Sequence, residues 1–304
     1  MLLCLFHRQN GDVMNIFIPR NIKIVVEDDN GETRFSQSYS EYLSNPSRNI
    51  NLSIYGGTLL DVLVEESLIT ETLQLRQIFT GNPYADATRL IGSIAESLVV
   101  KACNSNMEVN RILGRIARGG VRNSSLLDGF VAVATGSQNA KNLYPQYYNP
   151  CDTQRDIIWV DKNDTQNQLL CITPNTTSNS AKPAGIQVKA SHDGLNYVVN
   201  SITDYHYPVL YFDLNNDFEA VQHAIQRTHQ TATLIHPSDL QHELKDVLNG
   251  YFKIVVDIIN GSVPIQRIID HCKWNGLTEV LSGINASGID GGKNLILPPS
   301  INGR

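Results

Sequence analysis

Three polar side chains in two short apolar segments have the types and spacing needed to bind a divalent metal ion. Asp156 stands at the start of the apolar run 157–160, and Gln187 and Lys189 lie two residues apart within 185–191. Because side chains alternate along a β-strand, Gln187 and Lys189 would point to one face of the second segment. If the two segments pair, a carboxylate, an amide oxygen and an ammonium group converge. That combination suits a metal ion and a water molecule attacking a phosphate ester.

Each of these residues has an expected part in such chemistry. Asp156 would be the main metal ligand, and Gln187 would supply a neutral oxygen ligand. Lys189 would steer or polarise the attacking water and stabilise the charge that develops in the transition state. Glu96 is a polar position on an otherwise apolar predicted helix that precedes the strands, and it fits as a further ligand.

Ordinary structural roles compete with this interpretation. A lysine on a strand usually lies on a solvated face, and an aspartate before a strand usually caps a turn. Asp152 and Asp161 are alternatives to Asp156, which is preferred because it leads directly into the apolar run.

Hydrophobic periodicity predicts the elements that must position these residues. Apolar residues at helical spacing predict helices over 84–103 and 108–118, separated by the polar residues 104–106. Beyond a loop at 136–153, strands and helices alternate. Strands are expected at 156–160, 169–173, 186–190, 208–214, 232–235 and 252–259, and helices at 218–227, 238–248 and 264–274. Residues 195–202 fit either type, and the tail after residue 282 is expected to be irregular. The alternation predicts an α/β fold with a mixed central sheet flanked by helices.

The first part of the chain has a different pattern. β-Branched residues flank an Asp29-Asn30-Gly31 turn, which predicts a β-hairpin from 16–27 and 33–39. A short strand is expected at 49–55, ended by Gly56-Gly57, and a helix at 58–79. We therefore expect two domains, an N-terminal α+β region over 1–78 and an α/β domain over 79–304.

The chain resembles the PD-(D/E)XK nuclease superfamily in three features: a helix with Glu96, a strand entered by Asp156, and Gln187-Val188-Lys189 on the next core strand. The glutamine in place of glutamate resembles the Mrr-like and restriction-endonuclease-like branches of that superfamily. The resemblance covers roughly residues 84–235. It implies an αβββαβ core, a Mg²⁺ or Mn²⁺ cofactor held by Glu96, Asp156 and Gln187, and hydrolysis of DNA or occasionally RNA. It also implies a part in restriction or anti-phage defence. Two features depart from the family pattern, since the Asp-to-Gln separation is long and the acidic second ligand is missing.

Two other functions stay open beside an active nuclease. One is an inactive nuclease-fold module that binds nucleic acid or a protein, and the other is an unrelated α/β interaction protein. Residues 288–294 resemble a phosphate-binding loop only superficially, because the first glycine and the final Ser/Thr of that motif are absent. Any ATPase, helicase or sensor activity is therefore expected from a partner protein, and an oligomer is possible.

Four arginines recur at intervals of four, three and four residues and could form one basic helix face: Arg111, Arg115, Arg118 and Arg122. Such a face either contacts phosphate groups of nucleic acid or is simply solvated. Three tyrosines in the loop before Asp156 could stack on bases or pack the loop down: Tyr144, Tyr147 and Tyr148.

Composition sets outer limits on function. The 304 residues are 41% hydrophobic and carry a net charge of −6, which argues against a protein that coats nucleic acid but allows a local basic groove. The five cysteines are widely spaced, which indicates reduced thiols and a cytoplasmic location. No stretch approaches transmembrane length, so no membrane association is expected.

Overall fold

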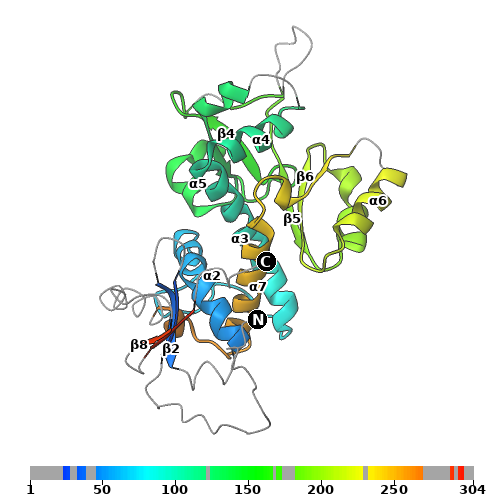
Figure 1. Cartoon of the computed structure of the whole chain (residues 1–304). Helices are drawn as coiled ribbons and strands as arrows, with labels where there is room; N and C mark the ends of the chain where they lie inside the picture. The colour runs from blue at the N-terminus through cyan, green and yellow to red at the C-terminus, as the bar shows by residue number, and fades with distance from the viewer. Residues whose placement is uncertain are drawn as a thin grey trace. The chain divides into compact units, whose positions relative to one another are not determined.

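The computed structural model describes residues 23–27, 33–38, 46–120, 124–166, 169–172, 182–228, 232–269, 288–290 and 294–297 (Figure 1). The chain divides into two compact units. One comprises Met1–Leu60 together with Val263–Arg304, and the other comprises Asp61–Ser262. The predicted domain boundary at residue 78 therefore falls inside the second unit, and the C-terminal segment belongs with the N-terminal one.

The first unit contains a four-stranded sheet built from both ends of the chain. Its strands follow the order β2-β1-β9-β8, with bounds Thr33–Ser38, Lys23–Glu27, Asn294–Leu297 and Gly288–Asp290. β1 pairs antiparallel with β2, which confirms the predicted hairpin, and parallel with β9. The prediction of an irregular tail is wrong for β8 and β9. Their pairing with β1 is a contact between the two ends of the chain, which local sequence patterns do not reveal.

Helix α2 replaces the strand predicted at 49–55. It spans Pro46–Glu65, with a proline in its first turn, where the missing N–H costs no hydrogen bond. Gly56 lies inside this helix and does not end it. A Cβ atom there would come within 3.3 Å of the side chains of Leu52 and Ile268, so the glycine allows close packing. The helix predicted over 58–79 ends at Glu65.

The second unit is mixed α/β, which confirms the predicted class at that level. Its strands are β3 (Phe130–Ala134), β4 (Ile157–Asp161), β5 (Gln187–Ser191), β6 (Val209–Asp213) and β7 (Leu234–Ile235). β3 and β4 form an antiparallel pair, whereas β5, β6 and β7 form a parallel sheet. A single bridge between Ile157 and Ile186 links the two sheets. β3 was not predicted, and the expected strand at 169–173 contributes only isolated bridges in its described part.

The α-helices of this unit are α3 (Pro83–Ser105), α4 (Met107–Ala117), α5 (Gln138–Leu143), α6 (Phe218–Thr228) and α7 (Leu244–Ile259). Helices α3 and α4 each begin at an asparagine N-cap. Asn82 accepts hydrogen bonds from two N–H groups at the start of α3, and Asn106 does the same for α4. The predicted break at 104–106 is thus a helix cap. Short helical turns occupy Leu195–Val199 and Ile202–Asp204, where the sequence was ambiguous, and α5 lies within the predicted loop.

The strand predicted at 252–259 is wrong, because these residues complete α7. Its buried side chains include Leu248, Tyr251, Phe252 and Val255, which recur at helical spacing. α7 packs against α3, and the ring of Phe252 meets that of Tyr84 edge-on at 4.9 Å. The run of β-branched residues suggested a strand, but packing against α3 favours a helix.

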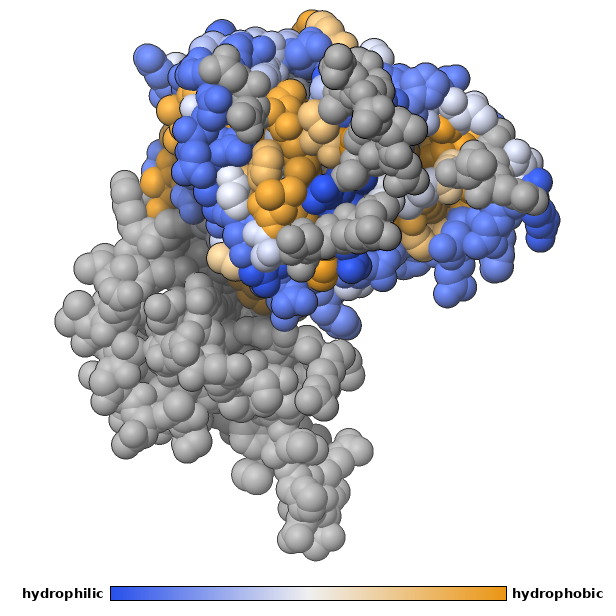
Figure 2. All heavy atoms as spheres, turned by 90° about the horizontal axis from the view of Figure 1, so that it is seen from above, coloured by the Kyte–Doolittle hydropathy of each residue, from blue (hydrophilic) through white to orange (hydrophobic). Residues whose placement is uncertain are grey.

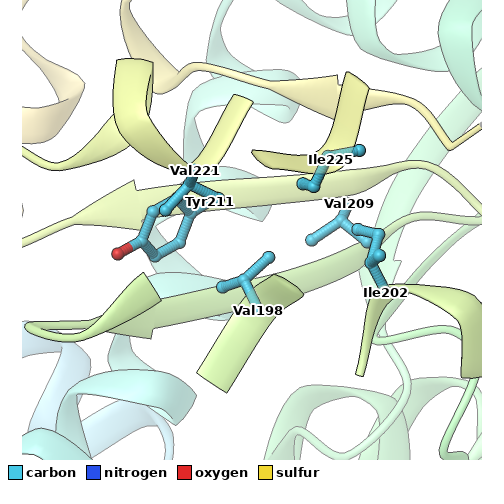
Figure 3. Close-up of a cluster of buried hydrophobic side chains, with 6 residues drawn as sticks. All are labelled: Val198, Ile202, Val209, Tyr211, Val221 and Ile225. Atoms are coloured by element: carbon cyan, nitrogen blue, oxygen red, sulfur yellow. The ribbon is translucent and has the colours of Figure 1, made fainter. Parts of the chain in front are cut away.

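A cluster of apolar side chains fixes one face of the parallel sheet. Val209 and Tyr211 of β6 pack against side chains from the helical turns at 195–204 and from α6 (Figure 3). The other members of the cluster are Val198, Ile202, Val221 and Ile225. β5 and β6 pair with Gln187 beside Val209 and Lys189 beside Tyr211. Neighbours in a parallel ladder share a face, so Gln187 and Lys189 lie on the side covered by these helical turns.

The visible surface is mixed in character. On the face in Figure 2, hydrophobic residues gather in patches between hydrophilic areas, as expected where polar groups are too few to cover a folded chain. Among the helices in the described ranges, none combines the length and apolar character needed to span a bilayer.

Candidate active site

The site forms where β4 and β5 meet. Asp156 N and Ile157 N both donate to Ile186 O, at 2.9 and 3.0 Å, and Ile186 N donates to Ile157 O at 3.0 Å. This is an isolated β-bridge, so the β5 residues beyond it form no ladder of backbone hydrogen bonds with β4. Val188 N donates instead to the Asp156 carboxylate, Oδ2, at 2.7 Å. The Asp156 carboxylate therefore lies beside β5 at Val188, the residue between Gln187 and Lys189.

The rival aspartates serve local turns. Asp152 accepts hydrogen bonds from the backbone N–H groups of residues 154 and 155 and pairs with the Arg155 guanidinium at 3.0 Å. Asp161 accepts from the backbone of Asn163 and Asp164. Among the described contacts of these three aspartates, only the side chain of Asp156 forms a hydrogen bond with β5.

Gln187 brings a buried oxygen to this place. The residue is 3% exposed, and its Oε1 atom has no hydrogen-bond partner among the described residues. A buried acceptor that stays unpaired costs on the order of 1–3 kcal/mol. An ion or a water molecule at this atom would remove that cost.

Lys189 lies between two tyrosine rings. Its Nζ atom is 5.6 Å from the ring centre of Tyr197 and 5.1 Å from that of Tyr205. Burial lowers the pKa of Lys189, but Tyr197, Tyr205 and the Asp156 carboxylate outweigh it, so the pKa lies above its ordinary value. The side chain is therefore a fixed positive charge at neutral pH. Sequence reasoning missed both tyrosines: Tyr197 lies in the ambiguous segment 195–202, and Tyr205 directly follows the helical turn Ile202–Asp204.

Glu96 projects from α3 into the same electrostatic environment. Burial, together with the nearby Asp156 carboxylate and against the opposing charge of Lys189, raises the pKa of Glu96 to about 8. Burial also raises the pKa of Asp156 to about 6, against the opposing effects of the Val188 N–H and Lys189. Two carboxyl groups that resist ionisation beside a lysine are typical of functional sites.

Glu66 is a further acidic neighbour that the sequence did not reveal. Its charge contributes to the raised pKa of Glu96. Its two carboxylate oxygens accept hydrogen bonds from Ser97 Oγ at 2.6 Å and Gln138 N at 2.8 Å. Glu66 follows α2 directly beside Glu65, and nothing in the local pattern distinguishes the two. Its contacts make it a support for α3 and α5 close to Glu96.

The donor set suits a hard divalent cation. Asp156, Gln187 and Glu96 would offer carboxylate and amide oxygens, the ligands that Mg²⁺ and Mn²⁺ prefer. The unpaired Gln187 oxygen supports this fit. No group of three or more His, Cys, Asp or Glu side chains in the described part is arranged to hold a metal, so the amide and water would have to complete the coordination.

The predicted basic face of α4 is partly engaged within the protein. Arg111 makes a two-pronged ion pair with Asp128, with N···O distances of 2.7 and 2.5 Å. Arg115 is exposed and Arg118 is half-buried, and Arg122 lies outside the described residues. Phosphate contact by Arg111 would have to compete with its carboxylate partner.

The tyrosines of the preceding loop have a packing role. Tyr144, Tyr147 and Tyr148 pack against a buried cluster made by Val133, Ala140, Ile158 and Val160. They hold α5 and the following turn onto the β3–β4 pair, which is the structural alternative that the sequence left open.

Comparison with models of protein families finds no match to this chain, and comparisons with curated proteins and with solved structures find none either. The resemblance carried by Glu96, Asp156, Gln187 and Lys189 therefore stays a prediction.

Proposed function

We propose that this protein is a metal-dependent nuclease that hydrolyses phosphodiester bonds of DNA, with Glu96, Asp156, Gln187 and Lys189 as its active site. The observation that carries the proposal is the hydrogen bond from Val188 N to the Asp156 carboxylate. It holds an acid beside the strand that carries an unpaired buried amide oxygen and a positively charged lysine.

The order of elements supports the same proposal. Helix α3 with Glu96 is followed by β3, by β4 behind Asp156, by β5 with Gln187 and Lys189, by helical turns, and by β6. β3 and β4 are antiparallel, and β5 and β6 are parallel. With α4 inserted before β3 and α5 inserted before β4, this order is compatible with the αβββαβ core that the resemblance implies.

The side chains suggest how hydrolysis would proceed. The Lys189 ammonium group would orient the attacking water and stabilise negative charge on the phosphoryl oxygens as the transition state forms. Glu96, with a pKa of about 8, holds a proton at neutral pH, while Asp156, with a pKa of about 6, is ionised for most of the time. A bound Mg²⁺ or Mn²⁺ would lower the pKa of a coordinated water and offset the charge of the phosphate.

Cleavage of plasmid DNA tests the proposal. The wild-type protein is incubated with supercoiled plasmid and either Mg²⁺, Mn²⁺ or EDTA, beside Asp156→Asn, Lys189→Met and the control Asp161→Asn. Asp161 ends the same strand but only caps a turn. We expect metal-dependent nicking by the wild type and the control, and loss of about 100-fold or more in both site variants, the range found when a preorganised electrostatic contact is removed. Equal cutting by all four proteins would refute the proposal.

A second candidate is a nuclease-like module that binds nucleic acid without cutting it. The absence of a third acidic ligand among the described residues favours this alternative. It predicts that the wild type binds DNA but neither binds Mn²⁺ through Asp156 nor cuts in its presence.

A role in restriction or anti-phage defence follows from the family resemblance alone. An ATPase or helicase partner and a cytoplasmic location are expected from the sequence, the latter from its widely spaced cysteines. All three remain predictions. Purification of the native complex from its source, followed by identification of bound proteins, would test for the partner.

A further inference from the structure

A polar cavity adjoins the candidate active site. Its volume is about 660 Å³, which is in the range of small-molecule sites. It lies at the amino ends of β6 and β7 and beside the helical turn Ile202–Asp204. The side chains that matter for its chemistry are Lys182, Thr203, Tyr205, His206, Tyr207 and Thr233.

Two contacts join this cavity to the active-site strand. Tyr205 lines the cavity, and its ring centre lies 5.1 Å from Lys189 Nζ. Pro208, another lining residue, accepts a 2.9 Å hydrogen bond through its carbonyl oxygen from Gln187 N. A ligand in the cavity would therefore lie next to the residues proposed to act on the phosphate.

The cavity pairs aromatic rings with positive charge. Lys182 Nζ is 4.4 Å from the ring centre of Tyr207. The Arg155 guanidinium is 5.8 Å from the same ring, but it does not line the cavity and is ion-paired with Asp152 at 3.0 Å. Hydroxyl groups of threonines and the imidazole of His206 add hydrogen-bonding capacity, and no Asp or Glu is among the described residues that line it. In a chain with a net charge of −6, such a region favours an anionic ligand.

Aromatic faces beside cations are the means by which proteins hold single-stranded nucleic acid. Bases stack on the rings, and lysine or arginine contacts the phosphates. A base within a duplex cannot offer its face in this way, because it is already stacked and paired.

We propose that this cavity binds one unpaired nucleotide of the substrate strand, with its base against Tyr207 and its phosphate near Lys182. The inference rests on the proposed nuclease function and specifies its substrate as single-stranded or locally unpaired nucleic acid. The adjoining phosphodiester would then lie towards Lys189, so the cavity would set the position of the cut.

Binding measured without metal separates this inference from catalysis. Fluorescence anisotropy in EDTA is used to compare a labelled oligo-dT strand with a duplex of equal length, for the wild type, Lys182→Gln, Tyr207→Leu and Tyr207→Phe. The control Lys141→Gln alters an exposed lysine that lies 5.9 Å from the Tyr148 ring, a similar pair outside the cavity. Circular dichroism and thermal melting verify that each variant is folded.

We expect the wild type and the control to bind the single strand at least tenfold more tightly than the duplex. Tyr207→Leu should weaken single-strand binding roughly 5- to 100-fold, as for loss of one stacked base, while Tyr207→Phe retains it. Lys182→Gln, at an exposed position, should reduce both the affinity and its salt dependence. Equal binding of duplex and single strand, or unchanged binding by both Lys182→Gln and Tyr207→Leu, would overturn the inference. If single-strand binding depends on Tyr207 but neither the plasmid nor the single strand is cut in the presence of Mn²⁺, the nuclease proposal alone fails.

Discussion

The Asp156 carboxylate is bound to the backbone of Val188, with 2.7 Å between Oδ2 and the amide nitrogen. This contact replaces a rung that a continuous β4–β5 ladder would have supplied. It fixes an acid at the point where two strands meet by a single bridge, beside the side chains of Gln187 and Lys189.

The first prediction concerns stability and pH. The pKa of Glu96 is raised from 4.5 to about 8 in the folded protein, so between these values the folded state binds more protons than the unfolded state. The free energy of unfolding of the metal-free protein should therefore fall as pH rises through this window, since each pKa difference of one corresponds to about 1.4 kcal/mol. Glu96→Gln should remove most of this slope. Urea unfolding in EDTA at pH 5, 6, 7 and 8 measures it.

Glu65→Gln is the matched control for Glu96→Gln. Glu65 is more than half exposed and pairs with Lys101, so its loss should leave the pH dependence unchanged. A flat pH profile in the wild type would contradict the burial of an uncharged Glu96.

The second prediction concerns metal binding and protons. A cation must displace the protons that Glu96 and Asp156 retain because of their raised pKa values of about 8 and 6. Affinity for Mn²⁺ should therefore increase from pH 6 to pH 8, with release of protons at pH 7. Isothermal titration calorimetry in two buffers of different ionisation enthalpy gives both quantities. Asp156→Asn should abolish binding and Asp161→Asn should retain it; a pH-independent affinity would speak against these ligands.

The third prediction concerns the buried Asn110–Trp159 pair. Trp159 Nε1 donates to Asn110 Oδ1 at 2.7 Å, and Asn110 Nδ2 donates to the carbonyl oxygens of Leu127 and Phe130, both at 3.1 Å. Asn110→Leu leaves these groups unpaired in the core and should destabilise the protein by about 2–4 kcal/mol. Urea unfolding followed by tryptophan fluorescence measures the change. The exposed Asn142→Ala should cost less than about 0.5 kcal/mol, and a similar loss in both variants would disprove the role of the buried pair.

The fourth prediction compares two glycine substitutions. A Cβ atom at Gly194 would lie 2.5 Å from both the Tyr211 hydroxyl and Val221 Cγ2. Gly194→Ala should therefore displace Tyr211, weaken its 2.7 Å hydrogen bond to Asp217, and destabilise the protein by about 1–3 kcal/mol. Gly92→Ala should have the opposite effect, because nothing lies within 4 Å of its Cβ and alanine favours a helix by about 0.5–1 kcal/mol. Thermal melting distinguishes these outcomes; a stable Gly194→Ala protein would show that this packing can relax.

Local patterns predicted the elements whose signals are themselves local. α3 and α4 were found because their apolar spacing and the polar break at 104–106 are visible in sequence, and β5 and β6 because their apolar runs are short and bounded by loops. α7 and β9 were missed for a different reason. β-Branched residues in α7 become helical through packing on α3, and β9 is a strand because it pairs with β1 at the other end of the chain.

By itself the sequence determined which side chains are candidates for the site, since their types and spacing singled out Glu96, Asp156, Gln187 and Lys189. Tertiary structure decided that Asp156, rather than Asp152 or Asp161, reaches β5, because only its carboxylate meets the free amide of Val188. It also placed Glu66 and two tyrosines around the site. Convergence of this kind depends on how strands separated by more than twenty residues meet, and that is set by packing of the whole sheet, which no local pattern encodes.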